Sequence, residues 1–186
     1  MSSKQESIYN NMRIYFAGDH AGFEMKQKLI EFARLLGHET EDLGPLEPKS
    51  GDDYPDFVIP LARKVAENPL PRLPIGGQAT PSFIKEGAKG VDFVVRGIVV
   101  AGSGQGEIIA MNRVKGARAA LFCPCNLDLI KASRDHNDSN IFAIGARFCT
   151  PEEARKGIKV WLETPFSNEE RHIRRLQKIE ALGARP

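Results

Sequence analysis

The chain has 186 residues, which is long enough for one well-buried domain and short for two. Apolar residues make up 41% and charged residues 27% of it, a balance ordinary for a soluble globular protein, and the net charge of +2 gives no sign of a nucleic-acid or membrane partner. No apolar run approaches the roughly 18 residues of a membrane span, so a transmembrane class is not expected.

Apolar residues recur in patterns that alternate between strand and helix along the chain. The predicted order is strand 13–17, helix 23–36, strand 39–43, helix 56–67, strand 97–101, helix 107–114, strand 118–122, helix 127–134, strand 141–146, helix 150–162 and a final basic helix after Ser167. This alternation predicts an α/β fold, in which a parallel sheet carries helices on both faces.

Cap signals mark several helix ends. Gly37 stands just after the first helix, at the C′ position that favours glycine. Thr150-Pro151-Glu152-Glu153 combines an N-cap threonine, a proline at N1 and a glutamate at N3, which predicts a helix start. Ser167-Asn168-Glu169-Glu170 repeats the capping-box pattern ahead of the last helix.

The N-terminal end and one internal segment depart from this pattern. Residues 1–12 are polar and lack the apolar core of a signal peptide, so we expect a disordered lead-in. Residues 68–90 are rich in proline and glycine and exceed the roughly 12–15 residues usual for loops in compact domains. We expect an inserted loop there, either packed through its apolar residues or disordered. The rest of 13–186 is expected to be one domain that ends in the basic helix.

The number and spacing of the cysteines indicate the cellular compartment. Cys123, Cys125 and Cys149 do not form an even disulfide set, and Cys123-Pro124-Cys125 lacks the CxxC spacing of redox and zinc motifs. The sequence therefore predicts ordinary reduced thiols in a cytoplasmic protein.

The segment Gly102-Ser103-Gly104-Gln105-Gly106-Glu107 follows the most apolar predicted strand. Alternate glycines let main-chain N–H groups crowd toward one point, because no Cβ blocks close approach or positive φ. With a helix N-terminus behind them, these groups form a nest for negative charge. Glu107 beside such a nest indicates a base next to a place where an oxyanion forms or binds.

Other interpretations of this glycine loop fit less well. Its spacing is not the G-x-G-x-x-G of dinucleotide-binding folds, because Glu107 stands where the third glycine would be. The Gly-Lys-Ser/Thr of a Walker loop is also missing. A tight strand-to-helix turn without a ligand remains as the alternative.

Further polar residues are expected at the same edge of the sheet, because ligands of parallel sheets bind at the carboxyl ends of the strands. This rule gathers Asp19-His20, the glycine loop, Cys123–Asn126 and Gly145–Arg147 on one rim. Alone, the Asp19-His20 pair is explained equally well as a cap or turn.

Two more groups of polar residues lie elsewhere in the chain. His136 falls in a polar turn between a helix and a strand, where a solvent-exposed histidine is an equally good interpretation. Arg171 and Arg175 share one face of the last helix and can hold a phosphate, although a solvated basic face is the alternative and a nucleic-acid patch a weaker one. The four histidines are scattered, without HxH or HExxH spacing, so no metal site is expected.

Several motifs occur together and in a fixed order, namely Arg13–Gly22, Asp53-Tyr54-Pro55, Gly102–Gly106, His136-Asn137-Asp138, Gly145-Ala146-Arg147 and Arg171 with Arg175. Together they resemble the type B ribose-5-phosphate isomerase family, which includes galactose-6-phosphate and tetrulose-phosphate isomerases. The resemblance spans 13–182 apart from 68–90. It implies a Rossmann-like three-layer α/β/α sandwich with a five-stranded parallel sheet. It also implies a homodimer or tetramer with shared active sites, and aldose–ketose isomerisation through an enediolate without metal or cofactor.

The resemblance also implies roles for particular residues. Catalytic roles fall to Glu107 as the base, His136 in ring opening and Ser103 through a hydroxyl hydrogen bond. Substrate contacts are implied for Asp19, His20, Tyr54, Gly102, Ser103, Gly104, Gln105, Gly106 and Asn137, and phosphate contacts for Arg147, Arg171 and Arg175.

One position departs from much of the family. Many members have a cysteine base immediately before the glycine loop, where this chain has Ala101. In another branch the loop reads Gly-Ser-Gly-x-Gly-Glu with the glutamate as base, and this chain matches that branch. The expected reaction interconverts ribose 5-phosphate and ribulose 5-phosphate. Alternatives are an isomerase of galactose 6-, allose 6- or erythrulose 4-phosphate, and a non-catalytic sugar-phosphate-binding protein; an NAD-dependent enzyme is disfavoured by the loop spacing.

Overall fold

The computed structural model describes residues 11–68 and 94–182. The predicted insertion at 68–90 therefore lies outside the described residues except for Asn68, and the predicted lead-in lies outside them except for Asn11 and Met12. Met12 is buried in the first strand, so the prediction that the lead-in extends through this residue is wrong. None of the helices in the described ranges is long and apolar enough to cross a membrane.

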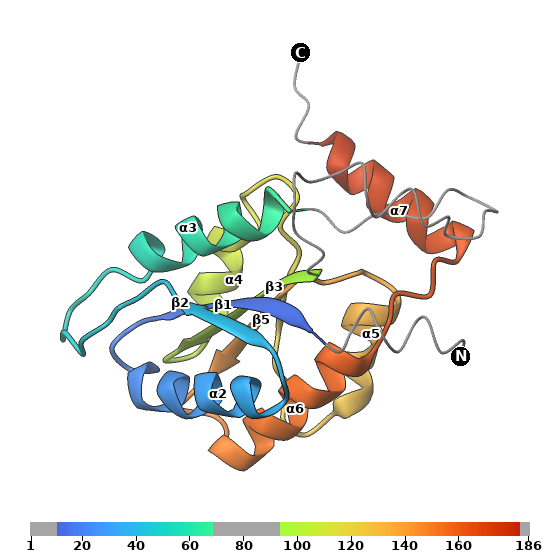
Figure 1. Ribbon diagram of the computed structural model, residues 1–186. Helices are drawn as coiled ribbons and strands as arrows, with labels where there is room; N and C mark the ends of the chain where they lie inside the picture. Colours follow the sequence, from blue (N-terminus) through green and yellow to red (C-terminus); the bar gives the residue numbers. More distant parts are fainter. Residues whose placement is uncertain (1–10, 69–93, 183–186) are drawn as a thin grey trace.

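Five parallel strands form a single twisted sheet (Figure 1). They are β1 (Met12–Gly18), β2 (Glu39–Asp42), β3 (Val94–Ala101), β4 (Ala119–Leu121) and β5 (Ile141–Gly145), and they lie in the order β2-β1-β3-β5-β4. The chain leaves β1 toward one side for β2 and toward the other side for the remaining strands. The carboxyl ends of β1 and β3 are therefore the switch point at which such sheets form a ligand crevice.

Helices cover both faces of the sheet and make three layers, as predicted (Figure 1). One face carries α2 (Phe23–Leu35), α5 (Leu127–Asp135) and α6 (Pro151–Glu163), and the other carries α3 (Pro55–Ala66) and α4 (Gln105–Met111). The last helix, α7 (Glu170–Ala181), stands apart from both layers in Figure 1.

The central strands are buried on both faces because each layer has its own core. Alternate residues of β1 point to opposite sides, so Ile14 and Phe16 pack under α2, α5 and α6, whereas Tyr15 and Ala17 pack under α3 and α4. All eight residues of β3 are buried. The predicted strand 97–101 covers the second half of β3, and the strand extends back to Val94 through the buried Arg96.

Glycines after β1 permit a close approach that positions the crevice. A Cβ on Gly18 or Gly22 would collide with the main-chain carbonyl of Val100 at the end of β3. The turn that leads from β1 into α2 therefore lies directly against β3. Residues 19 and 20 are held beside the loop that follows β3.

The predicted cap at the start of α6 is confirmed, and the one at the start of α7 is wrong. Thr150 and Glu153 form a reciprocal capping box. Ser167 does not cap α7, whose N-cap is Glu169, because Asn168 adopts a left-handed φ of 57° between them. The Ser167 hydroxyl instead donates to the carbonyl of Asp135, which ties the start of α7 to the end of α5.

Candidate active site

The carboxyl edge of the sheet brings together most of the residues predicted for one rim. Asp19 and His20 follow β1, the glycine loop 102–106 follows β3, and Arg147 follows β5. The guanidinium carbon of Arg147 lies 3.5 Å from the Cβ position of Gly102, so Arg147 covers the start of the glycine loop. Residues that are up to 128 positions apart in the sequence thus lie together at the carboxyl ends of the strands, where a parallel sheet forms its ligand crevice.

The glycine loop turns sharply into α4 at Gly104. This residue has a φ of 78° and is the N-cap of α4, and a Cβ here would lie 2.6 Å from the side chain of Leu121. The main-chain N–H of Gln105 donates to the Ser103 hydroxyl oxygen at 3.3 Å. Since the N–H groups in the first turn of a helix have no intrahelical partner, those of Gly104 and Gly106 lie at the open end of α4.

Glu107 lies in the first turn of α4 with its side chain turned into the protein. The residue is 4% exposed, and its Oε2 atom is buried without a hydrogen-bond partner among the described residues. Burial raises the pKa of Glu107; its own main-chain N–H partly offsets this, and the nearby charge of Asp19 raises the pKa further. A buried carboxylate with a free oxygen and a raised pKa is suited to taking a proton.

Asp19 links the turn after β1 to the glycine loop after β3. One carboxylate oxygen accepts from the main-chain N–H of Gly22 at 2.9 Å, and the other accepts from the N–H of Gly102 at 3.2 Å. The residue is 9% exposed. One donor of the predicted anion nest is therefore engaged by Asp19, which leaves Gly104 and Gly106 as the glycine N–H groups at the helix start.

Asp52 is a site residue that the sequence analysis missed. Its carboxylate lies 2.6 Å from Nδ1 of His20 and also accepts from the main-chain N–H of His20. The neighbouring Tyr54 places its hydroxyl 2.5 Å from the Cβ position of Gly106, so both residues reach the rim from the loop before α3. Asp52 adjoins the Asp53-Tyr54-Pro55 motif, and that proximity was the only signal for it in the sequence.

A shallow hollow opens beside the glycine loop. It is lined by Ser103, Gln105, Leu121, Phe122, Pro124, Gly145, Phe148 and Cys149. Cys123 and Cys125 are free thiols 3.4 Å apart, and Cys149 is free and donates to the carbonyl of Gly145. Burial and the charge of Glu153 raise the pKa of Cys149 to about 11, which keeps this thiol protonated and unreactive.

Four other predicted site residues lie at the opposite end of the sheet, near the amino ends of the strands. His136 is the C-cap of α5 and Asn137 follows it, at the turn that leads to the start of β5. Arg171 and Arg175 are exposed on α7, and Arg171 donates to Glu169 at 2.7 Å. The rings of His136 and the buried His172 lie 4.5 Å apart, so α7 and the end of α5 form one surface.

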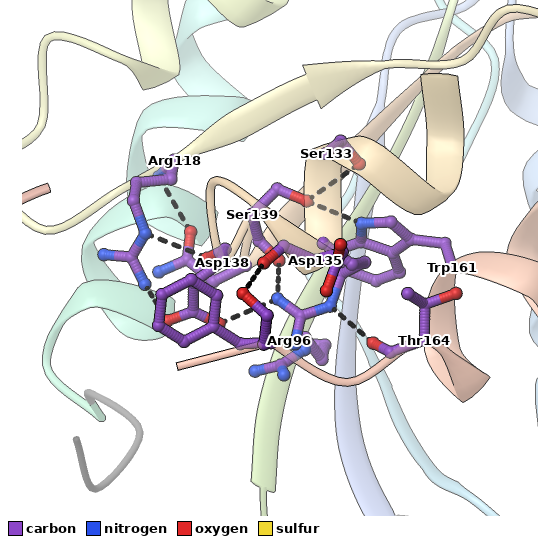
Figure 2. A network of polar contacts seen from close by, with 12 residues as sticks. Arg96, Arg118, Ser133, Asp135, Asp138, Ser139, Trp161 and Thr164 are labelled. Carbon is purple, nitrogen blue, oxygen red and sulfur yellow. Dashed lines mark hydrogen bonds and ion pairs between the residues drawn. The ribbon is translucent and has the colours of Figure 1, made fainter. Parts of the chain in front are cut away.

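A buried polar network joins the elements at the amino ends of the strands (Figure 2). The Asp138 carboxylate accepts from Arg118 at 2.7 Å and from Arg134 at 2.9 Å. The Trp161 indole donates to the Ser139 hydroxyl, and Ser139 in turn donates to Ser133, as Figure 2 shows. These contacts fix the turn 136–140 against α6, and with it the position of His136.

Within the described residues, no three His, Cys, Asp or Glu side chains gather into a group that could hold a metal ion. The crevice instead offers a buried carboxylate, an imidazole, main-chain N–H groups and a guanidinium. This set suits proton transfer on a small anionic substrate.

Comparison with known proteins shows which family this chain matches. The sequence profile of the Ribose/Galactose Isomerase family matches residues 14–73 and 78–179. Ribose-5-phosphate isomerase B of Mycobacterium tuberculosis is 36% identical over 167 residues, which cover 90% of this chain and 87% of the relative. The enzyme of the same name from Mycobacterium leprae is 34% identical with the same coverage.

Solved structures agree with the sequence relatives. The structure of ribose-5-phosphate isomerase B from Mycoplasma genitalium with bound ribulose-5-phosphate has a TM-score of 0.74 at 29% identity, over 92% of this chain and 96% of that one. Type B ribose 5-phosphate isomerase from Trypanosoma cruzi has a TM-score of 0.73 at 34% identity, over 93% and 97%. The protein has the three-layer α/β fold of sugar-phosphate isomerases. It belongs to the Ribose/Galactose Isomerase family, which confirms the family predicted from the motifs.

Proposed function

We propose that this protein is an aldose–ketose isomerase that interconverts ribose 5-phosphate and ribulose 5-phosphate, with Glu107 as the base. The relatives named ribose-5-phosphate isomerase B, and the bound ribulose-5-phosphate in one of them, support the substrate. The observation that carries the proposal is the buried Glu107 carboxylate, with a free Oε2, at the start of α4.

The proposed reaction moves one proton between adjacent carbons. Glu107 takes the proton from C2 of the open-chain aldose, and the electron pair left behind forms the C1–C2 double bond of an enediolate. Glu107 then returns the proton to C1, while the proton of the C2 hydroxyl passes to the C1 oxygen, so that C2 becomes the ketone and C1 carries the new hydroxyl. Because its pKa is raised, Glu107 is a stronger base than an exposed glutamate, which favours the first step.

The negative charge of the enediolate needs hydrogen-bond donors that are already in place. We assign this role to the N–H groups of Gly104 and Gly106, with the Ser103 hydroxyl as a further donor. The N–H of Gly102 is held by Asp19 and that of Gln105 by Ser103, so these two serve to shape the loop. Arg147, at the same rim, is assigned to the phosphate.

We infer that the rest of the predicted site comes from a second chain. The turn 136–140 leads into β5, and the five residues of this strand separate its two ends by roughly 16 Å at about 3.3 Å per residue, which is beyond the reach of a pentose phosphate. We infer a homodimer in which His136, Asn137, Arg171 and Arg175 of one chain complete the crevice of the other. His136 then assists ring opening, and the two arginines bind the phosphate through paired charge-assisted hydrogen bonds.

An isomerase assay across sugar phosphates tests the function. Ribose 5-phosphate, allose 6-phosphate, galactose 6-phosphate and erythrulose 4-phosphate are each supplied with and without a chelator. We expect the highest kcat/KM with ribose 5-phosphate and no loss on chelation. Preferred turnover of another sugar phosphate would replace the substrate, and binding without turnover would leave a sugar-phosphate-binding protein.

The free thiols support our inference that the reaction takes place in the cytoplasm.

A further inference from the structure

Asp52 and His20 make three polar contacts although they are 32 residues apart. The Oδ1 atom of Asp52 lies 2.6 Å from Nδ1 of His20, and its two oxygens lie 3.3 and 3.0 Å from the main-chain nitrogen of His20. The Asp52 side chain is 5% exposed, whereas that of His20 is 36% exposed. A buried carboxylate therefore holds both the backbone and the ring of a histidine whose side chain stays partly exposed.

The chemistry of this pair fixes how the imidazole is used. A carboxylate only accepts hydrogen bonds, so at 2.6 Å the proton between the two groups belongs to Nδ1 of His20. The neutral ring then carries its hydrogen on Nδ1 and its lone pair on Nε2. Such carboxylate partners set both the tautomer and the orientation of functional histidines. Nε2 is the ring nitrogen left for a ligand.

His20 lies beside the residues that hold the glycine loop. His20 directly follows Asp19, whose carboxylate holds the glycine loop that leads to Glu107. The main-chain bond from His20 to Asp52 and the bonds from Asp19 thus fix two consecutive residues from opposite sides. A substrate hydroxyl or phosphate in this crevice meets an imidazole that cannot rotate about χ2 without breaking a short hydrogen bond.

We propose that Asp52 is a positioning residue: it holds His20 in the Nδ1–H tautomer so that Nε2 faces the sugar phosphate. This role rests on the proposed function, but the tautomer itself does not. The alternative is that Asp52 only anchors the loop between β2 and α3 to the end of β1. The two explanations differ in whether the effect of Asp52 on turnover depends on the His20 ring.

The first experiment observes the ring directly in the substrate-free protein. Long-range ¹H–¹⁵N correlation spectra distinguish the two tautomers, and His20→Gln identifies the signals of His20. We expect Nδ1–H in the wild-type protein and a shift toward Nε2–H in Asp52→Asn, whose amide can donate to Nδ1. An Nε2–H ring in the wild type would overturn the proposal whether or not the protein is an isomerase. Absence of isomerase activity with the expected tautomer would overturn the proposed function instead.

The second experiment is a double-mutant cycle on kcat/KM for ribose 5-phosphate. Loss of a carboxylate behind a metal-ligating histidine typically costs about ten- to a hundred-fold, and we expect Asp52→Asn to have an effect of the same order. His20→Gln keeps the main-chain N–H but has no imidazole, so adding Asp52→Asn to it should change kcat/KM less than twofold. The exposed Glu47→Gln removes a charge from the same loop and serves as the control. An equal loss from Asp52→Asn in both backgrounds would show that Asp52 only anchors the loop.

Discussion

The carboxylate of Asp19 accepts a hydrogen bond from the main-chain N–H of Gly102, 83 residues further along the chain, at 3.2 Å. This contact joins the turn after β1 to the loop that carries Glu107. It also brings a second negative charge near the proposed base, which contributes to the raised pKa of Glu107. The same residue therefore shapes the crevice and adjusts its chemistry.

Replacing Asp19 by asparagine should separate these two effects. The amide oxygen can still accept one of the two main-chain hydrogen bonds, but the negative charge is gone. The pKa of Glu107 should fall part of the way toward its ordinary value, because burial remains the larger cause. The acid limb of the pH profile of kcat/KM should move to lower pH, whereas the exposed Asp56→Asn should leave it in place. A limb that moves to higher pH would contradict this account.

The raised pKa of Glu107 also predicts a pH-dependent cost in stability. Between its ordinary and raised pKa values the folded state binds a proton that the unfolded state does not. The contribution of Glu107 to stability is therefore lost as pH rises through the raised pKa. Glu107→Gln should gain in urea midpoint over wild type as the pH rises from the ordinary pKa of a glutamate through the raised pKa of Glu107. A relative gain toward acid pH would have the wrong sign.

Arg171 should contribute to phosphate affinity rather than to the chemical step. Loss of a charge-assisted hydrogen bond typically weakens binding by about tenfold or more. We expect Arg171→Ala to raise KM for ribose 5-phosphate by that factor, with a smaller change in kcat. Arg174→Ala removes the same charge from an exposed position on α7 and is the matched control. Equal effects of the two variants would mean that the basic face is only solvated.

The shared site can be tested by subunit complementation. Glu107→Gln and His136→Ala should each have little activity alone. After unfolding and refolding of an equal mixture, about a quarter of wild-type activity should return, because half of the dimers are mixed and each mixed dimer holds one intact site. Refolded wild-type protein gives the reference. A mixture no more active than its parts would place both residues in the site of one chain.

Much of the fold could be predicted because local patterns decide it. The apolar runs of β1, β3 and β5 and the capping box at Thr150 each depend on neighbouring residues, and each prediction is confirmed. The start of α7 could not be predicted in this way. Ser167 matches the capping pattern, but its hydroxyl bonds to the Asp135 carbonyl in another element, a tertiary contact that no local pattern contains.

The site residues also divide into those that a sequence pattern could predict and those that depend on tertiary contacts. The rule that ligands gather at the carboxyl ends of strands placed Asp19, the glycine loop and Arg147 together. Asp52 was missed because a carboxylate in a loop looks like any surface residue until the fold brings it to His20. His136 lies at the opposite end of the sheet because the turn after a helix lies at the amino ends of the strands. The proposed pairing of two chains leaves no signal in the sequence pattern of one chain.

The most direct test of the role of Glu107 is isotope exchange during isomerisation in D₂O. Proton NMR follows the conversion of ribose 5-phosphate to ribulose 5-phosphate and the incorporation of deuterium at C1. We predict incorporation by the wild-type enzyme, because the carboxyl exchanges its proton with solvent between the two transfers. For Glu107→Gln we predict exchange and turnover lower by about a hundred- to ten-thousand-fold, with ribose 5-phosphate binding retained. Exchange near the wild-type rate in Glu107→Gln would contradict the assignment of Glu107 as the base.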